Sequence, residues 1–148
     1  MKVERVTEAA SEAWAELRAA LWPHADRAEL RREAAALLAK KPAAAAFLLR
    51  DEAGKAVAFA EATVRLDYVN GCSTSPVGFL EGIYVLPEWR RRGAARQLCA
   101  AVEGWARAEG CRELASDTGI ENALGQRMHQ ALGFAESERV VCYHKRLD

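Results

Sequence analysis

Hydrophobic residues recur along the 148-residue chain at two spacings, and these alternate in a way that predicts the order of helices and strands. Spacings of three and four residues, which place side chains on one face of a helix, occur at Trp14, Leu17 and Leu21. Every second residue is apolar from Ala58 to Leu66, which is the period of a strand. We predict strands over residues 3–6, 46–50, 55–68, 79–86, 114–117 and two within 136–146, and helices that begin after residues 7, 26, 90 and 121.

Prolines, glycines and a capping residue mark the ends of these elements. Pro87 ends a strand because it lacks the N–H that a ladder needs, and Gly110 and Gly133 follow helices. Asp26 begins the second helix as its cap. The order is strand, two helices, three strands, helix, strand, helix, strands, with no repeat or linker. It predicts one domain over residues 1–148, of the α/β (α+β) class, with a mixed and mostly antiparallel sheet.

The segment after the fourth strand carries the clearest chemical pattern. Beyond Pro87 the chain continues with Arg90, Arg91, Arg92, Gly93, Ala94 and Ala95. A helix start exposes unpaired N–H groups and the positive end of the helix dipole, and small residues leave that backbone open. Three arginines add positive charge, so the segment suits a pyrophosphate. The alternative interpretation of these six residues is an arginine-rich, solvated helix start.

Composition limits the partners and the compartment. The chain has 21 basic and 21 acidic residues, so it lacks the basic excess typical of a nucleic-acid binder. The four cysteines form no Cys-x-x-Cys pair and, with three scattered histidines, no zinc spacing; we expect free, buried thiols in a reducing compartment and no metal. No signal peptide and no apolar run of about 20 residues is present, so we expect a cytoplasmic protein without a membrane partner.

The pattern of Arg90, Gly93 and Ala95 resembles the acetyl-CoA signature of the GNAT acetyltransferases, and the element order resembles the GNAT fold. The resemblance implies a sheet of about six to seven strands with flanking helices. It also implies a splayed central parallel pair that admits the pantetheine arm of acetyl-CoA. The cofactor-binding residues it implies are Ile83, Val85, Arg90, Arg91, Arg92, Gly93, Ala94, Ala95 and Asn122.

Several segments outside this signature resemble one branch, the aminoglycoside 6'-N-acetyltransferases. They are Leu21-Trp22-Pro23, residues 67–71, 75–77, 79–82, 111–117 and 129–134, and Glu138-Arg139-Val140. The resemblance implies acetyl transfer to the 6'-amino group of aminoglycoside antibiotics, which confers resistance. It also implies a homodimer, possible through the final strands, where residues 140–143 are largely apolar.

A neutral protein that binds a polycationic sugar must gather carboxylates locally. Glu81, Asp117 and Glu136 are the candidates, although a solvated surface position is the usual fate of an acid. Glu81 is exceptional because it interrupts an apolar strand, so its burial requires a partner or a task. Trp22 and Tyr68 can supply flat walls for a sugar ring, with core packing as the alternative.

An alkyl ammonium must lose a proton before it can attack a thioester, and we predict Glu81 or Asp117 as the acceptor. A main-chain N–H such as that of Val85 would polarise the thioester oxygen. Many GNAT enzymes have a tyrosine acid at the position of His129, so His129, Tyr143 or departure of an unprotonated thiolate all stay open. Two other functions compete: acetylation of a polyamine, amino sugar or protein N-terminus, and acyl-CoA sensing without catalysis, which would not require Glu81.

Overall fold

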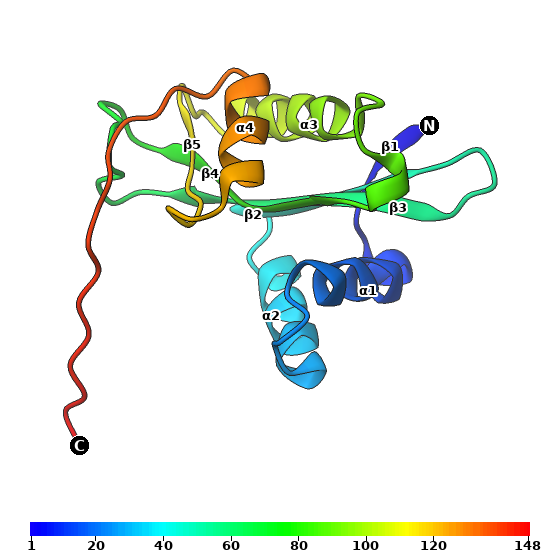
Figure 1. Ribbon diagram of the computed structural model, residues 1–148, viewed down its shortest axis with the longest axis horizontal. Coiled ribbons are helices and arrows are strands. Elements are labelled where there is room, and N and C mark those ends of the chain that lie inside the picture. Colours follow the sequence, from blue (N-terminus) through cyan, green and yellow to red (C-terminus); the bar gives the residue numbers. More distant parts are fainter.

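Five strands form one sheet in which the spatial order follows the sequence, as a computed structural model of all 148 residues shows (Figure 1). The first four strands are antiparallel neighbours, whereas the last two are parallel and are joined by a helical crossover. The strands are β1 (Lys2–Arg5), β2 (Ala44–Arg50), β3 (Ala56–Arg65), β4 (Val77–Val85) and β5 (Leu114–Ser116).

Helices cover both faces of the sheet (Figure 1). One face carries α1 (Ser11–Leu21) and α2 (Arg27–Ala39), and the other carries α3 (Ala94–Ala108) and α4 (Ala123–Ala131). Short 3-10 helices precede α1 at Glu8–Ala10 and follow β4 at Pro87–Trp89. None of the helices combines the length and the apolar character needed to span a membrane.

Alternation along β3 divides the core between the two helical layers. Ala58, Ala60 and Ala62 lie in the cluster that packs against α3, and Phe59 lies in the cluster that packs against α1. All four side chains are inaccessible to solvent. The alanines let α3 approach the sheet closely, while the larger Phe59 fills the space under α1.

A β-bulge interrupts the ladder between β3 and β4. Gly82 pairs with Glu61 and Leu80 pairs with Ala62, which leaves Glu81 as an extra residue on β4. An extra residue reverses the alternation of the strand beyond it and re-aims side chains and main-chain groups. The bulge therefore brings Glu81 and the following residue to the same face of the sheet.

Two sequence predictions about strands are wrong in part. The predicted strand 55–68 ends at Arg65, so Tyr68 lies in the connection to β4. The two predicted final strands are absent, because residues 135–148 have no helix or strand and lead away from the sheet (Figure 1). A strand requires a ladder of backbone hydrogen bonds to a neighbour, and this segment forms none with the rest of the chain. The sheet consequently has five strands rather than six or seven.

Candidate active site

A gap opens between the two parallel strands. They pair only where Gly78 to Leu80 faces Leu114 to Ser116. Beyond that point β5 has ended, whereas β4 continues to Val85. One edge of β4 is therefore left without a neighbouring strand in the middle of the molecule, as the splayed pair implied by the GNAT resemblance requires.

Main-chain groups of β4 face this gap. The N–H of Leu86 donates to the carbonyl of Val57 over 2.9 Å, so antiparallel alternation turns Ile83 and Val85 away from β3. The Nε–H of Arg90 donates to the carbonyl of Val85 over 2.9 Å, which agrees with this orientation. The bulge sets this alternation, because without the extra residue the neighbouring positions would face the gap instead.

The turn between β4 and α3 adopts an unusual backbone conformation. Gly93 has φ of 83° and Arg91 has φ of 62°, both in the left-handed region. Gly93 is the N-cap of α3, and no side chain caps this helix start. A Cβ added at Gly93 would meet no atom within 4 Å, so the first N–H groups of the helix are open to an incoming group. The helix α3 begins at Ala94. Arg90, Arg91 and Arg92 therefore belong to the connection between β4 and α3 and not to the first helical turn.

The three arginines of the turn differ in their surroundings. Arg90 holds the turn to the end of β4 through its bond to Val85 and lies with its guanidinium carbon 5.5 Å from the centre of the Tyr84 ring. Arg91 and Arg92 are exposed, and the guanidinium of Arg92 lies 5.1 Å from the Trp89 ring centre. Arg90 thus fixes the turn, and the other two leave their charge toward solvent.

Glu81 lies at the bulge and is partly buried, with 27% of its side chain exposed. The hydroxyl of Thr63 donates to Oε2 over 2.6 Å, and Nη2 of Arg65 donates to both carboxylate oxygens at 3.0 and 3.1 Å. Arg65 also stacks over the ring of Phe79 at 3.5 Å. The interruption of the apolar strand by an acid therefore has the partner that its burial requires.

Asp117 lies across the gap from Glu81. Leu80 and Ser116 are the last paired residues of their strands, so Glu81 and Asp117 are the next residue on each. Asp117 is exposed. The register brings the two predicted acids to opposite sides of the opening between β4 and β5.

Trp22 lies beside Gly82, the residue that follows Glu81. It follows the last residue of α1 and is half-buried. Its ring packs edge-on against Phe59 with 6.4 Å between centroids, and a Cβ added at Gly82 would lie 3.1 Å from Cη2 of the indole. The ring therefore packs against Phe59 in the core and also lies next to Gly82, the residue that follows Glu81.

Two predicted binding residues lie outside this group. Tyr68 is 75% exposed in the connection between β3 and β4. Glu136 is exposed in the C-terminal segment, where the side chain of Arg139 bonds to it and lowers its pKa. Close by, a Cβ on Gly71 would lie 2.5 Å from Cβ of Ser137, so this part of the segment passes over the same connection.

Asn122 and His129 are both committed to local contacts. Oδ1 of Asn122 accepts from the N–H of Gly125 over 2.9 Å and caps α4. The ring nitrogens of His129 lie 2.7 Å from the Ser116 hydroxyl and 2.7 Å from the Gly125 carbonyl, and Ser116 Oγ donates to Leu80 over 3.1 Å. His129 thus joins α4 to the last paired position of β4 and β5.

The other residue considered as an acid, Tyr143, is 92% exposed in the C-terminal segment.

A buried ion pair next to Trp22 is not among the predicted site residues. Glu61 is 2% exposed and Arg18 is 4% exposed, and they contact each other beneath α1. Burial raises the pKa of Glu61 to about 7, while the Arg18 charge and the Trp14 N–H act to lower it. The sequence carries a signal for it, because Glu61 interrupts an apolar strand between Ala60 and Ala62, as Glu81 interrupts the next strand.

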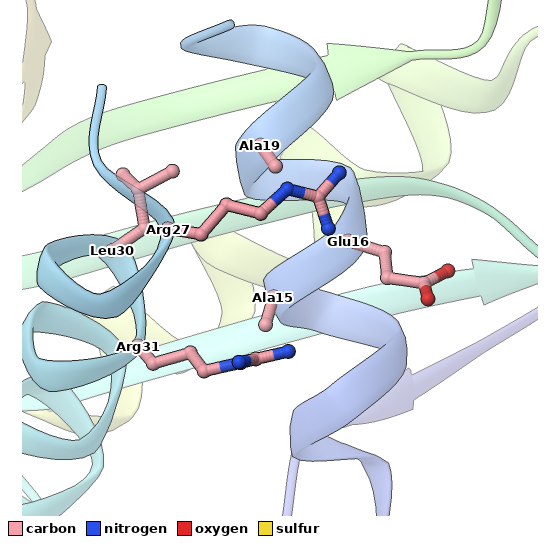
Figure 2. Close-up of a pocket in the computed structure, with 6 residues that line it drawn as sticks. All are labelled: Ala15, Glu16, Ala19, Arg27, Leu30 and Arg31. Carbon is pink, nitrogen blue, oxygen red and sulfur yellow. The ribbon is translucent and has the colours of Figure 1, made fainter. Parts of the chain in front are cut away.

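A separate hollow lies between the two helices on the other side of α1. Figure 2 shows Arg27 and Arg31 of α2 extending toward α1 beside Ala15 and Ala19. It involves neither the turn at Gly93 nor the gap between β4 and β5, so it is not the candidate site. No group of three or more His, Cys, Asp or Glu side chains in the structure could hold a metal ion.

Comparison with known proteins relates this geometry to an enzyme family. The family model described as "Acetyltransferase (GNAT) family" matches residues 5–134. An aminoglycoside N(6')-acetyltransferase type 1 from Serratia marcescens is 54% identical over 136 residues, which is 92% of each chain. A protein of the same name from Salmonella enteritidis is 49% identical over 147 residues, 99% of each chain.

Solved structures give the same result. AAC(6')-Iy in complex with the bisubstrate analogue CoA-S-monomethyl-acetylneamine has a TM-score of 0.93 and 46% identity, covering 99% of this chain and 98% of that one. The apo aminoglycoside 6'-N-acetyltransferase AAC(6')-IG from Acinetobacter haemolyticus has a TM-score of 0.94 and 44% identity, covering 100% of both. The chain therefore belongs to the GNAT acetyltransferase family, within its aminoglycoside 6'-N-acetyltransferase group.

Proposed function

We propose that this protein transfers the acetyl group of acetyl-CoA to the 6'-amino group of aminoglycoside antibiotics and so confers resistance to them. One observation carries the proposal: the gap beyond Leu80 and Ser116 has an edge of β4 without a strand partner on one side and two acids at the point where β4 and β5 separate. The first feature suits a thioester and the second suits an ammonium, so a single opening serves both substrates. Relatives that share about half of their residues with this chain carry that activity in their names.

The residues around the β4–α3 turn fit coenzyme A. The space at Gly93 and the uncapped start of α3 suit a pyrophosphate, which the N–H groups of residues 91–95 and the exposed Arg91 and Arg92 would hold. Ile83 and Val85 turn main-chain groups toward the gap, where the pantetheine amides would pair with them as a further strand does. Asn122 would contact this arm near the start of α4. When bound, acetyl-CoA supplies an activated acyl thioester.

Glu81 would accept the proton of the substrate ammonium, directly or through a water molecule. Its carboxylate now accepts bonds from Thr63 and Arg65, and Arg65 is 43% exposed and therefore able to move aside. A substrate ammonium would take the place of that guanidinium. Asp117, on the opposite side of the gap, would hold a second ammonium or share the proton.

The thioester oxygen would be stabilised by a main-chain N–H of β4 that faces the gap, that of Val85 or of Ile83, which is nearer to Glu81, and this group needs no reorganisation during the reaction. The contacts of His129 support a bracing role, because both of its ring nitrogens already have partners. We therefore assign it no proton transfer. The proposed attack is direct and requires no covalent enzyme intermediate.

Substrate recognition would depend on charge and on flat surfaces. Glu81, Asp117 and Glu136 would attract a polycation to a chain with no net charge, and Trp22 and Tyr68 would contact the sugar rings. Glu136 and Tyr68 lie toward the same connection, because the segment near Ser137 passes over Gly71. We propose that they form the outer side of the site.

We further propose one catalytic domain over residues 1–148 that forms a homodimer in the cytoplasm. The C-terminal segment carries four apolar side chains that are 62–92% exposed: Val140, Val141, Tyr143 and Leu147. They lie on a stretch without strand partners, and β5 has an unpaired edge. The C-terminal segment of a second copy would cover such an edge. The four unpaired cysteines suit a reducing compartment.

The test is a panel of amines incubated with the purified protein and acetyl-CoA. We expect turnover of aminoglycosides with a free 6'-amine, and mass spectrometry and NMR of the product to place one acetyl group on that nitrogen. Fast acetylation of a polyamine, a simple amino sugar or a peptide N-terminus, with none of kanamycin or tobramycin, would replace the proposed substrate class. Acetyl-CoA binding without turnover of any amine would support a sensor.

A further inference from the structure

The sheet face under α1 contains a buried ion pair that takes no part in the proposed reaction. Nε and Nη2 of Arg18 donate to the two carboxylate oxygens of Glu61 at 3.0 and 3.1 Å, and the indole N–H of Trp14 donates to the same carboxylate at 3.0 Å. Nη1 of Arg18 donates to the carbonyl of Leu30 on α2 at 3.2 Å. A buried ion pair adds little net stability compared with apolar residues of similar volume, so its fixed geometry calls for another explanation.

The guanidinium of Arg18 is also the surface on which Trp22 rests. Its central carbon lies 4.8 Å from the centre of the Trp22 ring, and the main-chain N–H of Trp22 donates to the Arg18 carbonyl at 2.9 Å. The guanidinium plane is fixed along its edges, at Nε and Nη2 by Glu61, at Nη1 by the Leu30 carbonyl, and by Glu33 at 3.4 Å from Nη2, and it presents one face to the ring. Glu61 holds the Nε and Nη2 edge and so helps to set the surface on which the Trp22 ring rests.

Gly82 lies against the same ring, at its Cη2–Cζ2 edge. It pairs with Glu61 across the β3–β4 ladder and directly follows Glu81. A Cβ at this position would lie 3.1 Å from Cη2 and 3.4 Å from Cζ2 of Trp22, and 3.6 Å from Cγ of Glu61. The indole thus occupies the space that any other residue would fill, and it does so next to the carboxylate proposed to receive the substrate proton.

We propose that Arg18 and Glu61 are positioning residues that hold the Trp22 ring over Gly82 and so shape the wall of the acceptor-amine site beside Glu81. The inference rests on the proposed function, because it concerns the aminoglycoside side of that reaction. Arg18 and Glu61 touch neither substrate, and their effect passes through the indole. The coenzyme side of the gap, at Val85 and Gly93, lies outside this contact set.

Two variants test this, one at each contact of the ring. Arg18→Lys keeps the charge but loses the plane and the second contact with Glu61, and Gly82→Ala keeps the ion pair but displaces the indole. We expect each to raise the KM for an aminoglycoside roughly tenfold while the KM for acetyl-CoA stays within about twofold. The matched control is Arg31→Lys, since Arg31 also joins α2 to α1, through Glu12 at 2.8 Å, but is 56% exposed.

A double-mutant cycle separates positioning from general loss of stability. With Trp22→Phe as the background, the smaller ring leaves room for a Cβ, so Gly82→Ala should cause little further change in the aminoglycoside KM. Additive effects, or an equal rise in both KM values, would overturn the inference. Arg18→Lys and Gly82→Ala enzymes with an unchanged aminoglycoside KM would overturn it too. A parent protein that acetylates no aminoglycoside would instead contradict the proposed function.

Discussion

Glu81 accepts a 2.6 Å hydrogen bond from the hydroxyl of Thr63 at the position where β4 has one residue more than β3. The extra residue has two consequences. It presents an acid at the point where β4 and β5 separate, and it turns the main-chain groups of Ile83 and Val85 toward the gap between these strands. The proposed base and the proposed thioester contacts therefore derive from the same irregularity of one strand.

Glu81→Gln tests the base. An amide has nearly the shape of the carboxylate and can accept the Thr63 bond, but it cannot take a proton from an ammonium. We expect kcat to fall by about 10²- to 10⁴-fold, the usual contribution of a positioned base, with the acetyl-CoA dissociation constant little changed. Glu52→Gln, in the exposed β2–β3 turn, is the control. Unchanged turnover in Glu81→Gln would remove Glu81 from the mechanism.

Gly93→Val tests the coenzyme cradle. The left-handed backbone at φ of 83° costs an ordinary residue about 1–2 kcal/mol, and a branched side chain would also cover the uncapped N–H groups. We expect isothermal titration calorimetry to detect no coenzyme A binding. Gly104→Ala is the matched control within α3, because its Cβ would meet nothing within 4 Å. It should bind normally and gain about 1 kcal/mol of stability. Normal affinity in Gly93→Val would contradict the cradle.

Glu113 predicts a dependence of stability on pH. Its carboxylate accepts bonds from the hydroxyl and N–H of Thr74 and from the N–H of Ser73, and these lower its pKa. Around these pKa values the folded state therefore binds fewer protons than the unfolded state. The stabilisation that the Glu113 carboxylate gives to the folded protein is complete above its unfolded pKa of about 4.3 and is lost as pH falls through its folded pKa.

Urea denaturation of the parent and of Glu113→Gln measures this contribution. We expect the parent to be the more stable protein at pH 7 and the difference in unfolding free energy to shrink below about pH 4. A difference that grows as the pH falls would show that the sign is wrong. Glu109→Gln is the control, since it lies at the end of α3 and makes none of these bonds.

Thiol labelling tests the proposed homodimer. Cys142 is exposed in the single chain, whereas Cys99 is buried and its pKa is raised to about 12 by burial and by Glu103. Ellman's reagent should therefore label Cys142 first, and Cys142→Ser should abolish the fast phase. If the C-terminal segments of two copies pair, the rate will fall as protein concentration rises. A fast phase independent of concentration, with a monomer in sedimentation, would contradict the dimer.

Local signals in the sequence were sufficient for most of the fold. Asp26 does cap α2, where its carboxylate accepts from the N–H of Glu29 at 3.3 Å, and Gly110 and Gly133 end their helices with φ of 86° and 94°. These features depend on a few neighbouring residues, so they can be predicted from the sequence. Residues 136–146 also have a strand-like pattern, but a strand needs a partner that this chain alone does not provide.

The candidate site was predictable in its chemistry and less so in its geometry. An acid within an apolar strand marked Glu81 correctly as a residue with partners, but nothing local indicates a bulge, because a bulge depends on the register of two strands. Glu61 also interrupts an apolar strand and is buried more deeply than Glu81, at 2% exposure. Pairing of Glu61 with Arg18 links residues 43 positions apart, which periodicity alone does not reveal.

A crystal structure with bound coenzyme A is the most direct test of the central claim. We expect the pyrophosphate to lie against the main-chain N–H groups of residues 91–95 and the pantetheine arm to lie along Ile83 and Val85. The sulfur should lie near the point where β4 and β5 separate. Glu81 and Asp117 should then face the position of the acetyl group from the two strands. Coenzyme A bound elsewhere, with the β4 edge and the Gly93 turn free of ligand, would contradict the account.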